Sequence, residues 1–74
     1  MPSMSLSDIA YDRDARTLDV TFISSGRRYR YFEVAPEEHE ALLRAFSKGS
    51  WFNTRIKPRH DFALVFDASG RRQA

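Results

Sequence analysis

The sequence predicts one α+β domain, in which helices cover one face of an antiparallel sheet. Apolar residues first alternate along the chain, and a helical pattern then follows at 36–48. The hydrophobic fraction of 42%, with 30% charged residues, is typical of a folded domain. Because the strands are grouped ahead of the helices, an α+β class is favoured. We place the domain at residues 5–67, with flexible ends at 1–4 and 68–74.

Three strands are expected before the first helix, at residues 6–11, 17–24 and 27–34. Residues 12–16 form the first turn. Ser25-Gly26 supplies the second turn, because glycine adopts positive φ without strain. A fourth strand at 62–67 is an open alternative to an irregular tail, since its alternation is weak.

The second turn also predicts a strand register. A two- or four-residue loop centred on Ser25-Gly26 places Phe22 opposite Tyr29. Two positions further along each strand, Val20 then lies opposite Tyr31. The apolar side chains of both strands share one face in this register, whereas a slip of one residue would turn a whole strand over.

One main helix and one short helix should pack on that face. Pro36 opens the first helix, since proline is well suited to the first helical position. Gly49 is expected to end it, and Ser50 to cap a short second helix that Pro58 stops. The buried stripe of the first helix is expected to consist of His39, Leu42, Leu43 and Phe46.

Composition excludes several classes of site. The chain has no cysteine, which removes disulfides, thiolate zinc sites and cysteine nucleophiles. Neither histidine has an acid or a second histidine at metal-ligand spacing, so we predict no metal, no cofactor and no catalytic residue. No apolar run approaches the roughly 20 residues of a membrane span. The absence of cysteine favours the reducing cytoplasm.

Positive charge gathers in the middle of the chain. Residues 27–60 carry eight Lys and Arg residues against four Glu, and residues 41–60 contain no acid. A one-sided basic surface attracts phosphate, although a solvated helix face explains the same pattern. The candidate residues for binding RNA or another anion are Lys48, Arg55, Lys57, Arg59, Arg28 and Arg30. The free N–H groups of a helix starting at Ser50 would suit an anion as well.

Three aromatic residues are candidates for stacking on bases, namely Trp51, Tyr29 and Tyr31. Core packing competes with stacking in each case. The predicted register places both tyrosines on the face that the helices cover. For Trp51 a lid on the core is the favoured interpretation. If Phe52 and Ile56 face inward, Trp51 lies about 100° from that direction, at the border between core and solvent.

The order of these short motifs resembles the KTSC domain, which is named for the C-terminal extension of some lysyl-tRNA synthetases and also occurs as a standalone small bacterial protein. The matching residues are Tyr29, Tyr31, Ser47, Lys48, Gly49, Phe52, Asn53 and Ile56. The resemblance covers about residues 5–60 and departs at Trp51, where Tyr or Phe is more usual. It implies a domain without an established activity, for which RNA binding is suggested by the attachment to a tRNA enzyme.

Two hypotheses of different kinds follow. The first is a monomeric, non-catalytic module that binds RNA or another polyanion through the basic stretch. The alternative is a protein–protein interaction module that acts through an exposed aromatic patch or a sheet edge at 62–66. An enzyme ranks below both, because no set of residues in the sequence forms a catalytic pattern.

Overall fold

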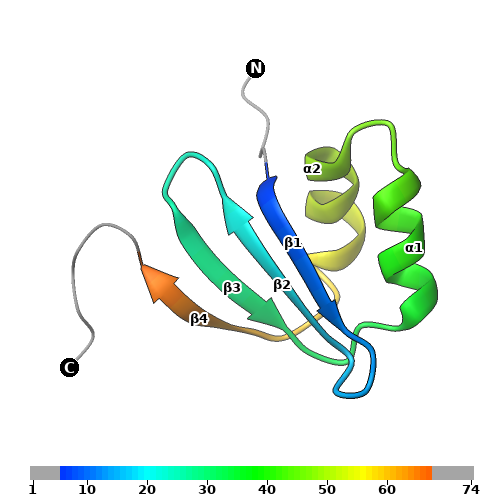
Figure 1. The fold of residues 1–74 in the computed structure, drawn as a ribbon. Coiled ribbons are helices and arrows are strands. Elements are labelled where there is room, and N and C mark those ends of the chain that lie inside the picture. The colour runs from blue at the N-terminus through cyan, green and yellow to red at the C-terminus, as the bar shows by residue number, and fades with distance from the viewer. Residues whose placement is uncertain (1–5, 68–74) are drawn as a thin grey trace.

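The computed structural model describes residues 6–67 (Figure 1). The elements in chain order are β1 (Leu6–Asp12), β2 (Thr17–Phe22), β3 (Arg27–Tyr31), α1 (Pro36–Arg44), α2 (Lys48–Trp51), the π-helical turn η1 (Phe52–Ile56) and β4 (Phe62–Asp67). The strands form one antiparallel sheet in the order β1-β2-β3-β4. The predicted α+β class is confirmed, with the fourth strand present. The predicted flexible ends at 1–4 and 68–74 lie outside the described residues.

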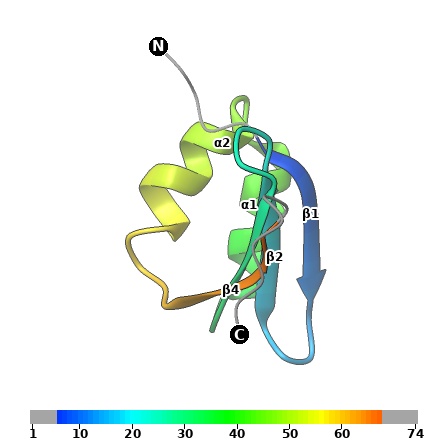
Figure 2. The same cartoon turned by 90° about the vertical axis from the view of Figure 1, so that its left-hand side faces the viewer.

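The molecule has two layers. Figure 2 shows the sheet nearly edge-on, with the helices on one side and no element covering the other. The alternation in β2 accounts for this arrangement, because Leu18, Val20 and Phe22 are buried while the residues between them are only partly so. Successive strand residues point to opposite faces, so one face is apolar and meets the helices while the other stays in contact with water.

The core lies between the sheet and the helices. Its buried side chains are Leu18, Val20, Phe22, Tyr31, Val34, Leu42, Phe52 and Ile56. Phe52 joins the two layers: its ring centroid lies 5.0 Å from that of Tyr31 and 5.8 Å from that of Phe22, both in edge-to-face geometry. Burial raises the pKa of Tyr31 to about 12, because the phenolate is less stable away from water.

The predicted register of the second hairpin is wrong by two residues. Val20 pairs with Tyr29, and Leu18 pairs with Tyr31. The loop therefore consists of residues 23–26, and Gly26 closes it at φ 73° with its N–H donating to the Phe22 carbonyl over 2.8 Å. A shift of two residues keeps every side chain on its face, so the buried face was predicted correctly despite the error.

The third strand and the first helix both end earlier than predicted. β3 ends at Tyr31, and the chain leaves the sheet through Glu33 at φ 56°. α1 ends at Arg44 instead of continuing to residue 48, with the Ala45 N–H donating to the Leu42 carbonyl over 3.2 Å. The sequence between the two helices contains no glycine or proline that would mark this end.

The early end of α1 changes its predicted buried stripe. Leu42 is buried as expected, and the His39 ring stacks on Tyr11 at a centroid distance of 4.5 Å. Leu43 is 47% exposed and Phe46 is 106% exposed. The prediction of burial is therefore wrong for both, and for Phe46 the reason is that it lies beyond the last turn of the helix.

The start of the second helix was also predicted at the wrong residue. α2 begins at Lys48, and its cap is Ser47, whose Oγ accepts a hydrogen bond from the Ser50 N–H over 3.3 Å. Gly49 does not end a helix but lies inside α2, where it is buried. The missing Cβ of Gly49 suits a position that packs closely against its surroundings.

Candidate binding site

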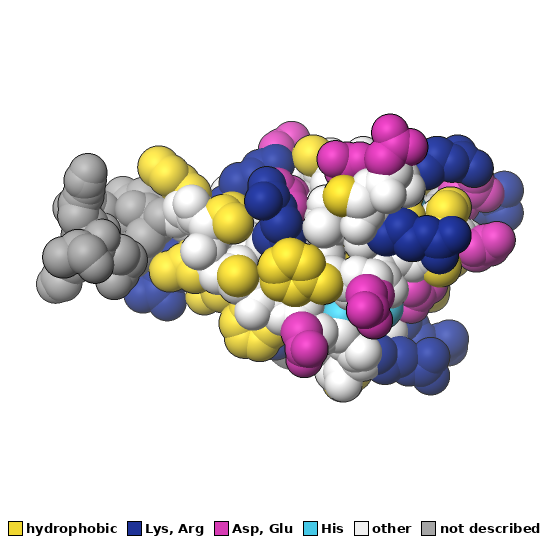
Figure 3. Space-filling model, turned by 90° about the horizontal axis from the view of Figure 1, so that it is seen from below, with side chains coloured by type: hydrophobic (Ala, Val, Ile, Leu, Met, Phe, Trp, Pro, Cys, Tyr) yellow, Lys and Arg dark blue, Asp and Glu magenta, His cyan; other side chains and the backbone are white. Residues whose placement is uncertain are grey.

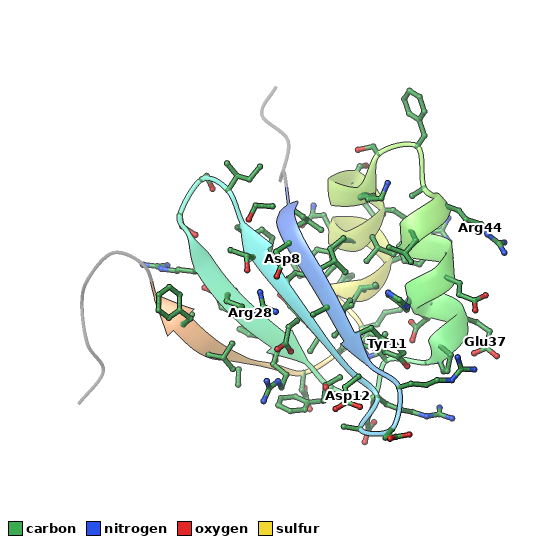
Figure 4. All side chains as sticks on the ribbon, in the orientation of Figure 1. Asp8, Tyr11, Asp12, Arg28, Glu37 and Arg44 are labelled. Carbon is green, nitrogen blue, oxygen red and sulfur yellow. The ribbon has the colours of Figure 1, made fainter. Side chains whose placement is uncertain are left out.

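The predicted arginines of the sheet lie on its open face and are held by aspartates. Arg28 Nη1 lies 2.6 Å from Asp8 Oδ2 (Figure 4), and Arg28 Nε lies 3.7 Å from Asp19. Arg30 donates two hydrogen bonds to Asp19, of 2.9 and 3.0 Å. This hydrogen bonding and the charge of Asp19 raise the pKa of Arg30 above its ordinary value. Both positive charges are thus neutralised locally, which leaves little attraction for phosphate.

A hollow of about 380 Å³ beside the Arg30–Asp19 pair is lined by more acidic than basic residues. Its lining includes Arg30 together with two acids, Asp12 and Asp19. Tyr11 is another lining residue of the hollow, and its hydroxyl donates a hydrogen bond to the Val34 carbonyl. An anion would meet more negative than positive charge in this hollow, so the open face of the sheet is a poor phosphate site.

Neither tyrosine of the family motif lies on the open face. Tyr31 is 1% exposed and belongs to the core. Tyr29 is half-buried, and its ring packs edge-to-face against Phe22 and Phe62 at centroid distances of 5.6 Å. Stacking on a base would require Tyr31 to leave the core, so the structure places this residue in a packing role.

Lys48, Trp51 and Arg55 occupy one side of a continuous helical segment, and we call this set the basic helical face. The backbone stays helical from α2 into η1, since Trp51 and Phe52 both have αR geometry. Residues three and four apart on a helix are neighbours, which places Trp51 between the two cations. Both cations are exposed, while Trp51 is half-buried and packs against the core. The face therefore offers one positive charge on each side of the half-buried Trp51.

Two other predicted cations do not join this face. Lys57 follows Arg55 by two residues, and residues two apart on a helix do not face each other. Arg59 lies after the helix, with its N–H donating to the Ile56 carbonyl over 3.0 Å. Its side chain lines a separate hollow of about 190 Å³ together with His60 and Asp61. Lys48 and Arg55 are thus brought together, whereas Lys57 and Arg59 are directed elsewhere.

The remaining motif residues are accounted for mainly by folding. Ser47 caps α2, Gly49 is buried within it, and Phe52 and Ile56 are fully buried on the inner side of η1. Asn53 is exposed on the outer side, and nothing in the structure explains its place in the motif. The helix start expected at Ser50 lies at Lys48 instead, and the Ser50 N–H is engaged by Ser47 Oγ.

Sequence reasoning missed a polar cluster around His60. Its Nδ1 lies 2.9 Å from the Phe32 carbonyl oxygen, and its Nε2 lies 2.9 Å from Glu38 Oε2. Both ring nitrogens therefore face acceptors, and neither is available as a general base. Glu38 lies 22 residues away in the chain, so no local pattern could have indicated the pair. It ties α1 to the segment that precedes β4.

Two further kinds of site are missing from the described residues. Between residues 6 and 67, no group of three or more His, Asp and Glu side chains is arranged to hold a metal ion. In the same part of the chain, no helix is both long enough and apolar enough to cross a membrane.

Comparison with known proteins identifies the family. The model of the KTSC domain matches residues 2–60. An uncharacterized protein of Stutzerimonas stutzeri is 47% identical over 60 residues, which are 81% of this chain and 83% of that protein. A lysine–tRNA ligase of Nostoc punctiforme is 39% identical over 57 residues, which are 77% of this chain but only 10% of the ligase.

A solved structure agrees in fold. The crystal structure of a KTSC domain protein from Yersinia pestis matches with a TM-score of 0.79 and 30% identity, covering 89% of this chain and 92% of that one. The Stutzerimonas relative is uncharacterized, so its name assigns no activity to this chain. Because the family model covers most of the sequence and the fold agrees, the chain belongs to the KTSC domain family.

Proposed function

We propose that the domain is a non-catalytic module that binds RNA, or a comparable polyanion, through the basic helical face. The observation that supports this choice is the pairing of charges. The sheet arginines are engaged by aspartates, whereas no ion pair of residues 6–67 includes Lys48 or Arg55. Proteins bind single-stranded nucleic acid through cations that contact phosphates and aromatic side chains that stack on bases. The unpaired cations beside Trp51 provide both kinds of group.

The ligase relative supports the same kind of ligand. Its name specifies tRNA as a substrate, and this chain resembles a tenth of its length. A small domain within such an enzyme would be useful if it held the RNA. We expect the protein to act in the cytoplasm, in keeping with its lack of cysteine.

Removing both cations of the face is expected to weaken RNA binding. The double variant Lys48→Ala/Arg55→Ala should bind labelled tRNA or oligouridine about ten-fold more weakly at low salt, which corresponds to about 1.4 kcal/mol. Each lost phosphate contact lowers the salt dependence on single strands by about 0.7, so the slope of log K against log salt should fall by about 1.4. Fluorescence anisotropy over a salt series measures both quantities.

A control with the same change in charge separates a site from a general field effect. Arg13→Ala/Arg16→Asn removes two positive charges from the β1–β2 turn, at the opposite end of the molecule from α2 (Figure 1). Asparagine is chosen because Arg16 has φ 58°, which asparagine tolerates. An equal loss in the control variant, or an equal loss in Lys57→Ala, would argue against the basic helical face. No RNA binding by the wild type would end the RNA proposal.

A second candidate function is contact with another protein chain through β4. This strand is the last in the sheet, and its exposed side chains are apolar: Phe62, Leu64, Val65 and Phe66 are each at least 40% exposed. Figure 3 shows hydrophobic side chains gathered at the end of the molecule where β4 lies. An edge strand without charged side chains among residues 62–66 is a favourable template for pairing with another strand.

Sedimentation tests the form of this candidate in which the partner is a second copy. If β4 pairs with itself, the mass should rise above the monomer value of 8.6 kDa as concentration increases. Leu64→Lys places a charge on the apolar strand and should restore the monomer. A strict monomer at the highest concentrations would discard self-pairing, and it would agree with the monomer expected for an RNA-binding module.

A further inference from the structure

The turn between α1 and α2 presents an aromatic side chain entirely to solvent. Phe46 is 106% exposed, the highest value among the large hydrophobic residues of the described chain. The backbone on both sides is anchored, since the Ala45 N–H bonds the Leu42 carbonyl and the Ser47 Oγ accepts from the Ser50 N–H. The phenyl group is therefore held on a turn that two helix caps define, which lowers the entropy lost when a ligand binds.

Cations lie on both sides of this phenyl group in the chain. Arg44 precedes it by two residues and Lys48 follows it by two, and both are exposed. Figure 4 shows Arg44 at the end of α1, with its side chain pointing away from the sheet. None of the ion pairs within residues 6–67 involves either cation, and residues 41–60 contain no acid. A ligand that carries both a flat apolar ring and negative charge would find both complements at this turn.

We propose that Phe46 stacks on a base of single-stranded RNA while Arg44 and Lys48 contact the neighbouring phosphates. This inference rests on the proposed function, and it extends the basic helical face, because Lys48 belongs to both. Base stacking on an aromatic side chain tolerates any sequence, since every base has a π-face. It gives a role to an apolar side chain that contributes nothing to the core.

The variant Phe46→Ala tests the stacking role. It should bind labelled oligouridine about ten-fold more weakly than the wild type, as truncation of a stacking residue does. The salt slope should not change, because no cation is removed. Binding of inorganic polyphosphate, measured by calorimetry, should also be unchanged, because polyphosphate has no base to stack. Phe46→Trp should retain the wild-type affinity for RNA.

A matched control is Phe66→Ala, which removes another exposed phenyl group on β4, 57% exposed. It should leave RNA binding unchanged. If oligouridine binds the wild type and Phe46→Ala equally, the stacking role is wrong while the proposed function stands. A loss for Phe46→Ala that extends to polyphosphate, or that Phe66→Ala shares, would also overturn it. Failure of the wild type to bind RNA would overturn the stacking role and the proposed function together. If the wild type then bound a protein partner without RNA and Phe46→Ala did not, the turn would be assigned to protein contact.

Discussion

Phe52→Ala is expected to lower the free energy of unfolding by about 3–5 kcal/mol, as truncation of a buried phenylalanine does. Phe52 is fully buried, and its ring contacts two aromatic rings of the sheet. Together with the fully buried Ile56, it attaches η1 to the core beneath the sheet. Domains are stable by only about 5–15 kcal/mol in total, so this loss is a large part of the stability and the variant should unfold at a much lower urea concentration than the wild type.

Urea unfolding followed by circular dichroism measures this loss. Trp51 fluorescence gives a second probe, because the indole packs against the core beside Phe52. The exposed Phe66 again supplies the control, and Phe66→Ala should stay within about 0.5 kcal/mol of the wild type. If Phe52→Ala had the same urea midpoint of unfolding as the wild type, the Phe52 ring could not be what anchors η1.

The faces of the sheet were predictable because alternation is a local property. In β2, every second residue is apolar, and this pattern needs no knowledge of the neighbouring strand. The register was not predictable in the same way. It depends on the loop, and Gly26 supports positive φ equally well at the second of two loop positions or at the last of four.

The error in register also hid part of the site. In the structure, Asp19 pairs directly with Arg30 across the strands, and opposite charges at paired positions attract. The predicted register placed Phe32 at that position, so Arg30 seemed free to meet phosphate. The opposite charges of Asp19 and Arg30 were visible in the sequence, but they indicate a pair only when the loop is placed at residues 23–26.

Helix ends were predicted less well because two serines flank Gly49. Either Ser47 or Ser50 can act as a cap, and the glycine favoured the later one. The actual choice of Ser47 ends α1 early and removes Phe46 from the core. Gly49 is buried inside α2, and burial of this kind is a tertiary effect that composition does not reveal.

His60 holds together three parts of the chain that are distant in sequence. Its ring bonds the carbonyl of Phe32, just after β3, and the carboxylate of Glu38 in the first turn of α1. A neutral imidazole has only one N–H, so both bonds are donated together only when the ring is doubly protonated. Glu38 Oε1 also accepts from the Ala35 N–H over 2.9 Å, which fixes the start of α1. The His60 side chain is only 10% exposed, so solvent screens this cluster weakly.

His60→Ala is expected to lower the free energy of unfolding by about 1.5–3 kcal/mol, because a nearly buried ring that lies within hydrogen-bond distance of a charged carboxylate is removed. Urea unfolding at neutral pH measures the loss. Arg59→Ala, the adjacent exposed residue, is the control and should cost much less. A variant as stable as the wild type would mean that water replaces the hydrogen bonding of the ring without loss.

The same cluster predicts how stability depends on acid. Burial acts to raise the pKa of Glu38, but the hydrogen bonds from His60 and Ala35, together with the charges of His60 and Arg59, outweigh it and hold this pKa below its ordinary value. The unfolded chain therefore takes up a proton at higher pH than the folded chain does. The stability that Glu38 contributes is present above about pH 4.5 and is lost as pH falls through the lowered pKa.

Glu38→Gln should remove this acid dependence, since glutamine does not titrate. As the pH falls below 4.5, the free energy of unfolding should fall less steeply in Glu38→Gln than in the wild type. Glu40→Gln removes an exposed acid from the same helix and should keep the wild-type slope. Equal slopes in Glu38→Gln and the wild type would show that Glu38 titrates alike in both states, so that its bonds to His60 and Ala35 add no stability. A shallower slope confined to Glu38→Gln would instead identify this carboxylate as the group through which acid releases α1 from the rest of the fold.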